Sequence, residues 1–190
     1  SIVSIFSTEN IVAYAPMIFV GILGLIIGSF LNVLVLRYNT GKGFGGRSMC
    51  FSCRRQLTSI DLVPVLSFLG FKGRCRTCKS KISPQYVLVE IFTALLFVLT
   101  YLHNITQFGI SSGEVFSVVF LIKIAIDFSI MSLFVAMVAY DIRHKIIPDS
   151  LVYTGAILMF VKVVISLFLF KIGLIGSIVV LLAGPIVALP

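Results

Sequence analysis

Long apolar segments dominate this sequence and limit what it can fold into more than any other feature. They cover roughly residues 11–36, 86–102, 115–140, 151–170 and 174–189. An α-helix rises ~1.5 Å per residue, so about 20 apolar residues span the ~30 Å hydrocarbon core of a bilayer. Hydrophobic residues make up 59% and charged residues 12% of the 190 positions, which is too apolar for a single soluble core. We therefore predict an all-α polytopic membrane protein with about five transmembrane helices.

The basic residues gather in one segment between the first two apolar runs. Residues 37–85 contain ten Lys and Arg side chains and a single acid, Asp61, although the net charge of the whole chain is +8. Basic residues in a short loop between spans indicate the cytosolic side, and they attract anionic lipid headgroups. The segment 103–113, which has no Lys or Arg, is predicted to lie on the opposite side. We expect membrane lipids rather than nucleic acid to be the partner of this positive charge.

Four cysteines in this basic segment form two Cys-x-x-Cys pairs, Cys50 with Cys53 and Cys75 with Cys78, separated by 21 residues. The spacing is typical of structural zinc sites, in which four thiolates close a tetrahedron and leave no open position for a catalytic water. Two disulfides or a redox pair are the alternative, but a cytosolic segment is kept reduced. The sequence therefore predicts a small cytosolic four-cysteine zinc domain between the first two spans.

Ionisable residues also occur within or beside the apolar runs. Asp141 follows the run that ends at residue 140, and such a residue is either functional or an ordinary solvated charge at a helix end. Lys123 and Asp127 are four residues apart within the same run, so they are predicted to face each other as a structural ion pair. His103 and His144 have no partners at ligand spacing, and no role is assigned to them.

Several short motifs follow one another along the chain. In order, they are Gly28–Val33, the two cysteine pairs around Asp61 and Pro64–Ser67, Lys72–Cys75, Ile82-Ser83 with Tyr86 and Glu90, and Asp141 with Ile147–Asp149. Each motif is weak alone. The ordered set covers most of residues 28–149 and resembles the bifunctional type IV prepilin peptidase family.

The resemblance implies an aspartic endopeptidase of the bacterial inner membrane that cleaves the basic leader from type IV prepilins or pseudopilins on the cytosolic side. Asp141 matches the first family aspartate. An aspartic protease needs two carboxylates, because one holds a proton while the other activates water. In many members the resemblance also implies N-methylation of the new N-terminus from S-adenosylmethionine, with Gly73 and Glu90 as the candidate cofactor-binding residues.

The sequence departs from the family pattern in two ways. Phe51 stands where a proline often follows the first cysteine, Leu62 replaces an asparagine, and Gln85-Tyr86-Val87 replaces Arg-Tyr-Pro. These positions bear on methyl transfer. The Gly-x-Gly-Asp motif that carries the second family aspartate does not occur in the 190 residues. We therefore expect an N-terminal portion, with a peptidase domain that is incomplete and inactive alone.

Asp149 is the nearest substitute for the second carboxylate, and the alternative is that it caps a helix predicted to begin near Ser150. The predicted organisation is a first span at 1–36, a zinc and methyltransferase-associated domain at 37–85, and a membrane-embedded peptidase domain at 86–190. A different class of function also remains open. In it, the chain is a non-catalytic, membrane-anchored zinc domain that binds partners or lipids.

Overall fold

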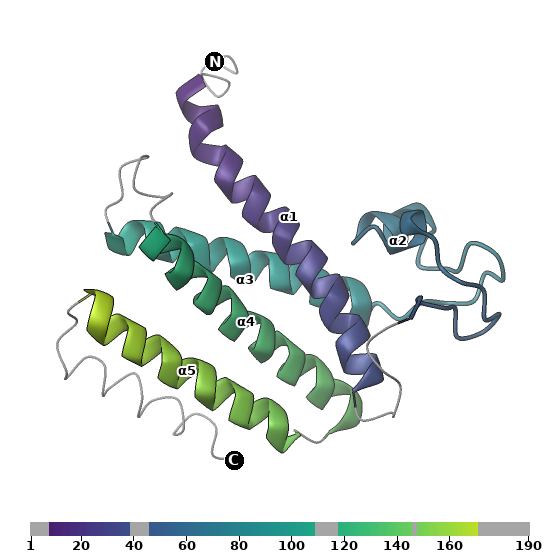
Figure 1. Ribbon diagram of the computed structural model, residues 1–190. Coiled ribbons are helices and arrows are strands. Elements are labelled where there is room, and N and C mark those ends of the chain that lie inside the picture. The colour runs from purple at the N-terminus through teal and green to yellow at the C-terminus, as the bar shows by residue number, and fades with distance from the viewer. Residues whose placement is uncertain (1–7, 39–45, 109–117, 146–147, 171–190) are drawn as a thin grey trace.

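The computed structural model describes residues 8–38, 46–108, 118–145 and 148–170, and the fold of these residues is all-α, as predicted. Four long helices form its body, namely α1 (Thr8–Arg37), α3 (Gln85–Phe108), α4 (Val118–His144) and α5 (Asp149–Phe170) (Figure 1). Two short helices, η2 (Ser59–Leu62) and α2 (Leu66–Gly70), lie in the connection between α1 and α3.

Four helices in the described part of the chain are long and apolar enough to cross a membrane. The candidate spans are residues 15–37, 85–106, 118–144 and 149–167. Large apolar side chains such as Ile26, Leu95 and Phe160 are exposed on their outer faces, as expected for surfaces that face lipid. The fifth predicted span, 174–189, lies outside the described residues.

Two of the helices extend further than predicted at their C-terminal ends, where polar residues follow the apolar run. Helix α3 continues to Phe108 instead of ending near residue 102, and α4 continues to His144 instead of ending near residue 140. Polar residues do not stop these helices, because their side chains find partners or suit a helix end. Asn104 donates inward to Asp127, and Arg143 lies in the last turn of α4, where the helix dipole favours positive charge.

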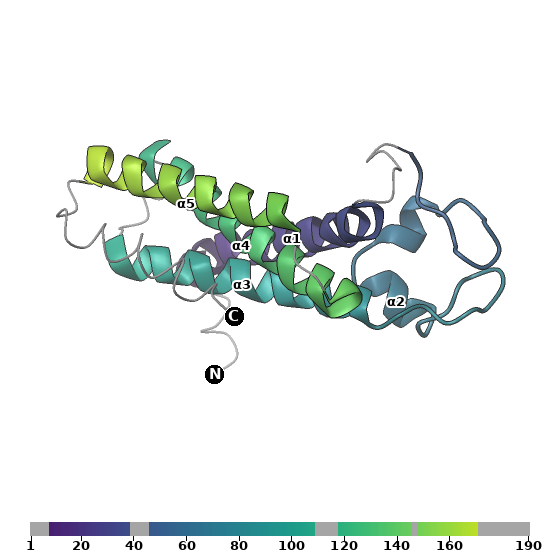
Figure 2. The same ribbon diagram turned by 90° about the horizontal axis from the view of Figure 1, so that it is seen from below.

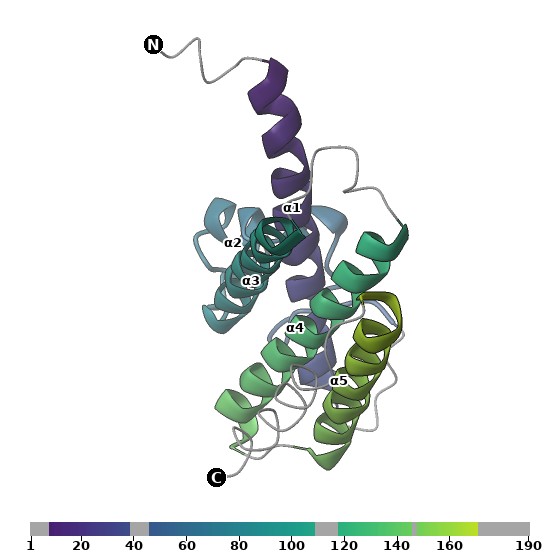
Figure 3. The same cartoon turned by 90° about the vertical axis from the view of Figure 1, so that its left-hand side faces the viewer.

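The helices pack so that α3 contacts α1 and α4, while α4 also contacts α1 and α5 (Figure 3). Residues 46–84, which include η2 and α2, lie at one end of this bundle (Figure 2), beside the end of α1 and the start of α3. We call residues 46–84 the metal-binding segment, after the zinc site predicted for their four cysteines. Their end of the bundle is the one predicted to face the cytosol.

Helices α1 and α3 approach each other closely at two glycines of α1. A Cβ atom added at Gly24 would lie 2.5 Å from Ala94 Cα, and one added at Gly28 would lie 2.7 Å from Glu90 Cα. Backbone atoms cannot give way as a flexible side chain can, so these positions require glycine. The spacing of four residues places both glycines on one face of α1, as in the small-residue motifs by which membrane helices associate.

A buried polar cluster joins α3, α4 and α5 within the spans. The predicted pair of Lys123 and Asp127 is confirmed, with Nζ and Oδ2 3.4 Å apart. Lys162 of α5 adds a second ion pair, in which its Nζ lies 2.8 Å from Asp127 Oδ1. Asn104 of α3 donates to Asp127 Oδ2 at 3.1 Å and accepts from Lys123. Asp127 is only 5% exposed, so partners from three helices offset the cost of burying its charge.

Replacing Gly24 with alanine should weaken the contact between α1 and α3, because the new Cβ meets the backbone of Ala94. We expect a loss of about 1–3 kcal/mol of stability, measured as a lower midpoint of thermal unfolding in detergent. Gly21→Ala is the matched control on the same helix, since a Cβ there meets Val98 Cγ2 at an ordinary 3.6 Å. Equal midpoints for the two variants would contradict the close contact.

Candidate metal centre and the cavity beside it

Each cysteine pair lies in a tight turn, and the two turns have the same backbone hydrogen bonds. The N–H of Arg54 donates to the carbonyl of Cys50 at 2.9 Å, and the N–H of Lys79 donates to the carbonyl of Cys75 at 3.0 Å. The first cysteine of each pair also donates its backbone N–H to the carbonyl of the residue five positions later, at 2.9 Å in both turns. Arg54 and Lys79 both have positive φ angles, 56° and 59°. The turns are therefore two copies of one structural unit.

The two turns bring all four cysteine sulfurs together. Their Sγ atoms lie within 4.8 Å of one another, and those of Cys50 and Cys78 are 3.8 Å apart. A tetrahedral zinc ion with Zn–S bonds of about 2.3 Å has S–S edges of about 3.8 Å. None of the four cysteines is in a disulfide, whose S–S bond would be about 2.0 Å. The cluster can therefore hold a metal ion, and its geometry fits a closed site of four thiolates.

The surroundings favour the thiolate form of two of these cysteines, Cys50 and Cys78. At Cys53 the backbone N–H of Arg55 also favours the thiolate, but burial and the neighbouring thiols outweigh it and raise the pKa to about 11. Hydrogen bonds from the backbone N–H groups of Cys53 and then Ser52 lower the pKa of Cys50 to about 6. The hydroxyl of Ser80 lies 3.1 Å from Cys78 Sγ and is the first cause of the lowered pKa of Cys78. Metal ions bind thiolates rather than thiols, so a lowered thiol pKa favours metal binding near neutral pH.

An ion pair fixes the chain that follows the first turn. Arg55 Nη2 and Asp61 Oδ2 are 2.9 Å apart. The backbone N–H of Thr58 donates to the same carboxylate oxygen at 2.9 Å. This backbone bond is the first cause of the lowered pKa of Asp61, and the Thr58 hydroxyl and Arg55 add to it. Asp61 therefore holds η2 against the first cysteine turn.

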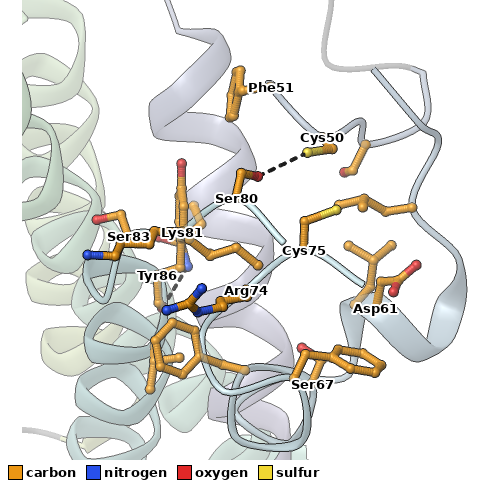
Figure 4. Close-up of a pocket in the computed structure, with 18 of the residues that line it drawn as sticks. Cys50, Phe51, Asp61, Ser67, Arg74, Cys75, Ser80, Lys81, Ser83 and Tyr86 are labelled. Atoms are coloured by element: carbon orange, nitrogen blue, oxygen red, sulfur yellow. Dashed lines mark hydrogen bonds between the residues drawn. The ribbon is translucent and has the colours of Figure 1, made fainter. Parts of the chain in front are cut away.

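A cavity of about 400 Å³ lies between the metal-binding segment and the ends of the helices. Figure 4 shows Cys50 and Cys75 of the cysteine turns on one side of it, and Ser83, just before α3, with Tyr86 in the first turn of α3 on the other. Five basic, two acidic and four aromatic side chains line it, namely Arg55, Arg74, Arg76, Lys81 and Arg143, Asp61 and Glu90, and Phe51, Phe68, Phe71 and Tyr86. Such a wall suits a small ligand that has both an anionic group and a flat or apolar part.

Two buried polar side chains on the helix side of the cavity connect α1, α3 and the metal-binding segment. Asn32 of α1 donates its Nδ2 to the carbonyl of Tyr86 at 2.9 Å. Glu90 of α3 is 7% exposed, and one of its carboxylate oxygens accepts the N–H of Val65 at 2.8 Å. Glu90 thus lines the cavity and also holds the start of α2. Its predicted role in cofactor binding stays a prediction.

Gly73 lies in the turn that leads into the second cysteine pair. Its φ is +64°, and a Cβ there would lie 2.8 Å from Phe68 Cζ. Its N–H donates to the carbonyl of Phe68 and its carbonyl accepts from Ile82, both at 2.8 Å. The positive φ angle of the turn and the closeness of the Phe68 ring therefore explain why residue 73 is a glycine. Gly73 is not among the residues that line the cavity, and its predicted cofactor role stays a prediction.

Asp141 and Asp149 lie on either side of the connection between α4 and α5. Asp141 is exposed in the last turn of α4, and Asp149 is exposed at the start of α5. The N–H of Val152 donates to the carbonyl of Pro148 at 3.4 Å, so Pro148 occupies the cap position. Helix α5 thus begins within one residue of the expected Ser150, but the cap is Pro148 and not Asp149 as expected. Asp149 lies in the first turn, where the helix dipole favours its negative charge. The catalytic role of Asp141 stays a prediction.

Three residues of this site were not identified from the sequence. Arg55 and Ser80 occupy equivalent positions, five residues after Cys50 and Cys75, so a comparison of the two pairs could have singled them out. Val65 lies within the motif Pro64–Ser67, but no local pattern indicates its contact with Glu90, which is 25 residues away.

The helices and the cysteine cluster define a multi-pass membrane protein whose first connection carries four cysteines able to hold a metal ion. Residues 22–104 match the family model of the bacterial peptidase A24 N-terminal domain. A prepilin leader peptidase/N-methyltransferase of Bacillus subtilis is 36% identical over 131 residues, which cover 68% of this chain and 47% of that protein. A protein of the same description from Myxococcus xanthus is 34% identical, and the match covers 73% of this chain and 37% of that protein. Another, from Vibrio cholerae, is 32% identical, and the match covers 79% of this chain and 57% of that protein.

The chain belongs to the prepilin leader peptidase/N-methyltransferase family. It spans between 37% and 57% of the length of these three curated relatives. No solved structure matches it significantly.

Zinc should co-purify with the protein at about one ion per chain, because a closed four-thiolate site of this geometry binds zinc tightly at neutral pH. Cys75→Ser should lose the metal and make residues 46–84 sensitive to protease, since Cys75 is the buried ligand. Ser52→Ala is the control, because it keeps all four thiols. Elemental analysis and limited proteolysis measure both effects. Metal-free fresh protein, or a disulfide within a cysteine pair, would contradict the assignment.

Proposed function

We propose that this protein is an aspartic endopeptidase that removes the basic leader from type IV prepilins or pseudopilins at the cytosolic face of the bacterial inner membrane. The observation that carries the proposal is the similarity to prepilin leader peptidase/N-methyltransferases over 68% to 79% of the chain. The basic segment 37–85 supports a cytosolic position for this end of the bundle.

We assign the first catalytic carboxylate to Asp141. It is exposed at the polar end of α4, so a leader at the membrane surface can reach it without entering the bilayer. Aspartic hydrolysis needs a second carboxylate close by, so that one is ionised while the other is protonated. That group is either Asp149 or the aspartate of a Gly-x-Gly-Asp segment, which the 190 residues do not contain. We favour the segment, because the place of Asp149 in the first turn of α5 explains that residue.

A second class of function is a non-catalytic metal domain that membrane helices anchor and that binds partners or lipids. In its favour, all four sulfur ligands come together within the described residues, whereas a second catalytic aspartate is not identified there. A leader-cleavage assay separates the two classes, because a binding module cleaves no leader even when the missing Gly-x-Gly-Asp segment is supplied.

In a leader-cleavage assay, membranes that contain this chain alone should show no detectable processing of a prepilin. Adding a separate membrane segment that carries Gly-x-Gly-Asp should restore it, and Asp141→Asn should abolish it again. Loss of one acid–base partner costs a factor of about 10²–10⁴ in rate. Asp149→Asn is the matched control and should keep activity in the complemented membranes. Normal cleavage by the chain alone, stopped by Asp149→Asn, would identify Asp149 as the second acid instead.

We also infer that the cavity beside the metal centre binds S-adenosylmethionine for N-methylation of the processed N-terminus. This ligand carries a carboxylate that suits the basic side chains and an adenine that suits the aromatic ones. Phe51, Leu62 and Val87, at which the chain departs from the family pattern, all line the cavity. These departures would therefore act directly on the ligand.

Arg74→Gln should weaken the binding of radiolabelled S-adenosylmethionine on the order of tenfold, because a charge-assisted hydrogen bond to the carboxylate is lost. Arg54→Gln is the matched control: Arg54 is an exposed arginine of the same segment that does not line the cavity. Both variants should keep zinc. Equal binding by the two variants would place the cofactor elsewhere.

A further inference from the structure

Apolar side chains are exposed along residues 59–70 of the metal-binding segment. They are Ile60, Leu62, Val63, Leu66 and Leu69, which are 62%, 42%, 39%, 67% and 64% exposed. Single exposed apolar residues are ordinary, but five within a stretch this short form a patch of the kind that marks an interaction surface. We call residues 59–70 the apolar segment.

The level of the apolar segment along the helix bundle follows from its contact with α3. Val65 donates its N–H to Glu90 at 2.8 Å, and Glu90 lies five residues beyond Gln85, where the candidate span begins. At ~1.5 Å per residue, Glu90 is about 7–8 Å along the axis of that span. Helix α2 therefore starts level with the second turn of a membrane helix, not beyond its end.

The position of Val65 is imposed by its surroundings. Its φ is 59°, which a β-branched residue rarely adopts, so the local sequence alone would not hold this backbone. Glu90 supplies the hydrogen bond that fixes it, and the backbone of Glu90 is itself fixed against α1 at Gly28. The chain that follows presents Leu66 and Leu69 outward.

Charges around the apolar segment suit an anionic bilayer surface. Arg54 precedes it and Lys72 follows it, and both are exposed. The acid within it, Asp61, is neutralised by Arg55 at 2.9 Å. Each basic residue near an anionic membrane contributes about 1 kcal/mol.

We propose that the apolar segment inserts into the interface of the bilayer that α1 and α3 span, with Ile60, Leu66 and Leu69 among the acyl chains. Interfacial helices bury their apolar face ~5–10 Å into the boundary between headgroups and acyl chains, which agrees with the level of Glu90. The segment thus anchors the metal centre to the membrane surface at a fixed height. This inference does not rest on peptidase or methyltransferase activity.

Tryptophan fluorescence tests the proposal directly, because the chain contains no tryptophan. The purified chain, with zinc bound, is placed in nanodiscs of phosphatidylcholine and phosphatidylglycerol with brominated acyl chains, which quench tryptophan on contact. Leu69→Trp reports on the apolar segment. Thr77→Trp, in the exposed second cysteine turn, is the aqueous control, and Leu95→Trp, on the exposed face of α3, is the lipid control.

Quenching of Leu69→Trp should exceed that of Thr77→Trp by roughly threefold or more and approach that of Leu95→Trp, as expected for a side chain at the acyl boundary. Zinc content checks that each variant folds. Quenching of Leu69→Trp no stronger than that of Thr77→Trp would overturn the proposal. A blue-shifted but unquenched Leu69→Trp would also overturn it, because a protein surface, from a second copy or a substrate, would then cover the segment.

Discussion

The close contact between α1 and α3 sets the position of everything at the polar end of this protein. Gly28 lets the two backbones meet at Glu90, and one turn further along α1, Asn32 donates to the carbonyl of Tyr86 at 2.9 Å. Glu90 then holds Val65 and with it the start of α2. A membrane offers no hydrophobic force between helices, so packing and polar contacts of this kind must supply the association. Asn32, Tyr86 and Glu90 also line the cavity beside the metal centre, so these contacts form its wall on the helix side.

Charge divides the polar end of the protein into two regions. Residues 37–85 carry ten basic side chains and one acid, whereas residues 141–149 carry two acids, Asp141 and Asp149, against two basic residues, Arg143 and Lys145. A basic prepilin leader would be repelled by the first region but not by the second, where the two acids offset the two bases. On the proposed function, the metal-binding segment therefore serves the membrane surface and the small-molecule cavity, and the ends of α4 and α5 serve the peptide.

The sequence predicted features that depend on composition or on short spacing. The apolar runs predicted the spans, the two Cys-x-x-Cys pairs predicted the sulfur cluster, and the spacing of four residues predicted the pair of Lys123 and Asp127. Lys162 could not be assigned to that pair, because nothing in a lone lysine on another helix tells which helix it will face. The bond between Glu90 and Val65 was equally hidden, since it depends on how closely α1 and α3 pack. Helix ends were misjudged where polar residues such as Asn104 found partners inside the bundle.

A metal ion held by both cysteine turns would constrain the chain between them. A metal bound by both turns is a crosslink that closes the 21 residues from 54 to 74 into a ring, and the whole apolar segment lies inside that ring. Closing a ring removes conformational freedom from the open chain, as a disulfide does. Withdrawal of the ion would restore that freedom at both ends of the apolar segment at once. Zinc binding and insertion of the apolar segment into the bilayer would then be thermodynamically linked. Removing zinc with a chelator in solution would therefore weaken the binding of this segment to the membrane.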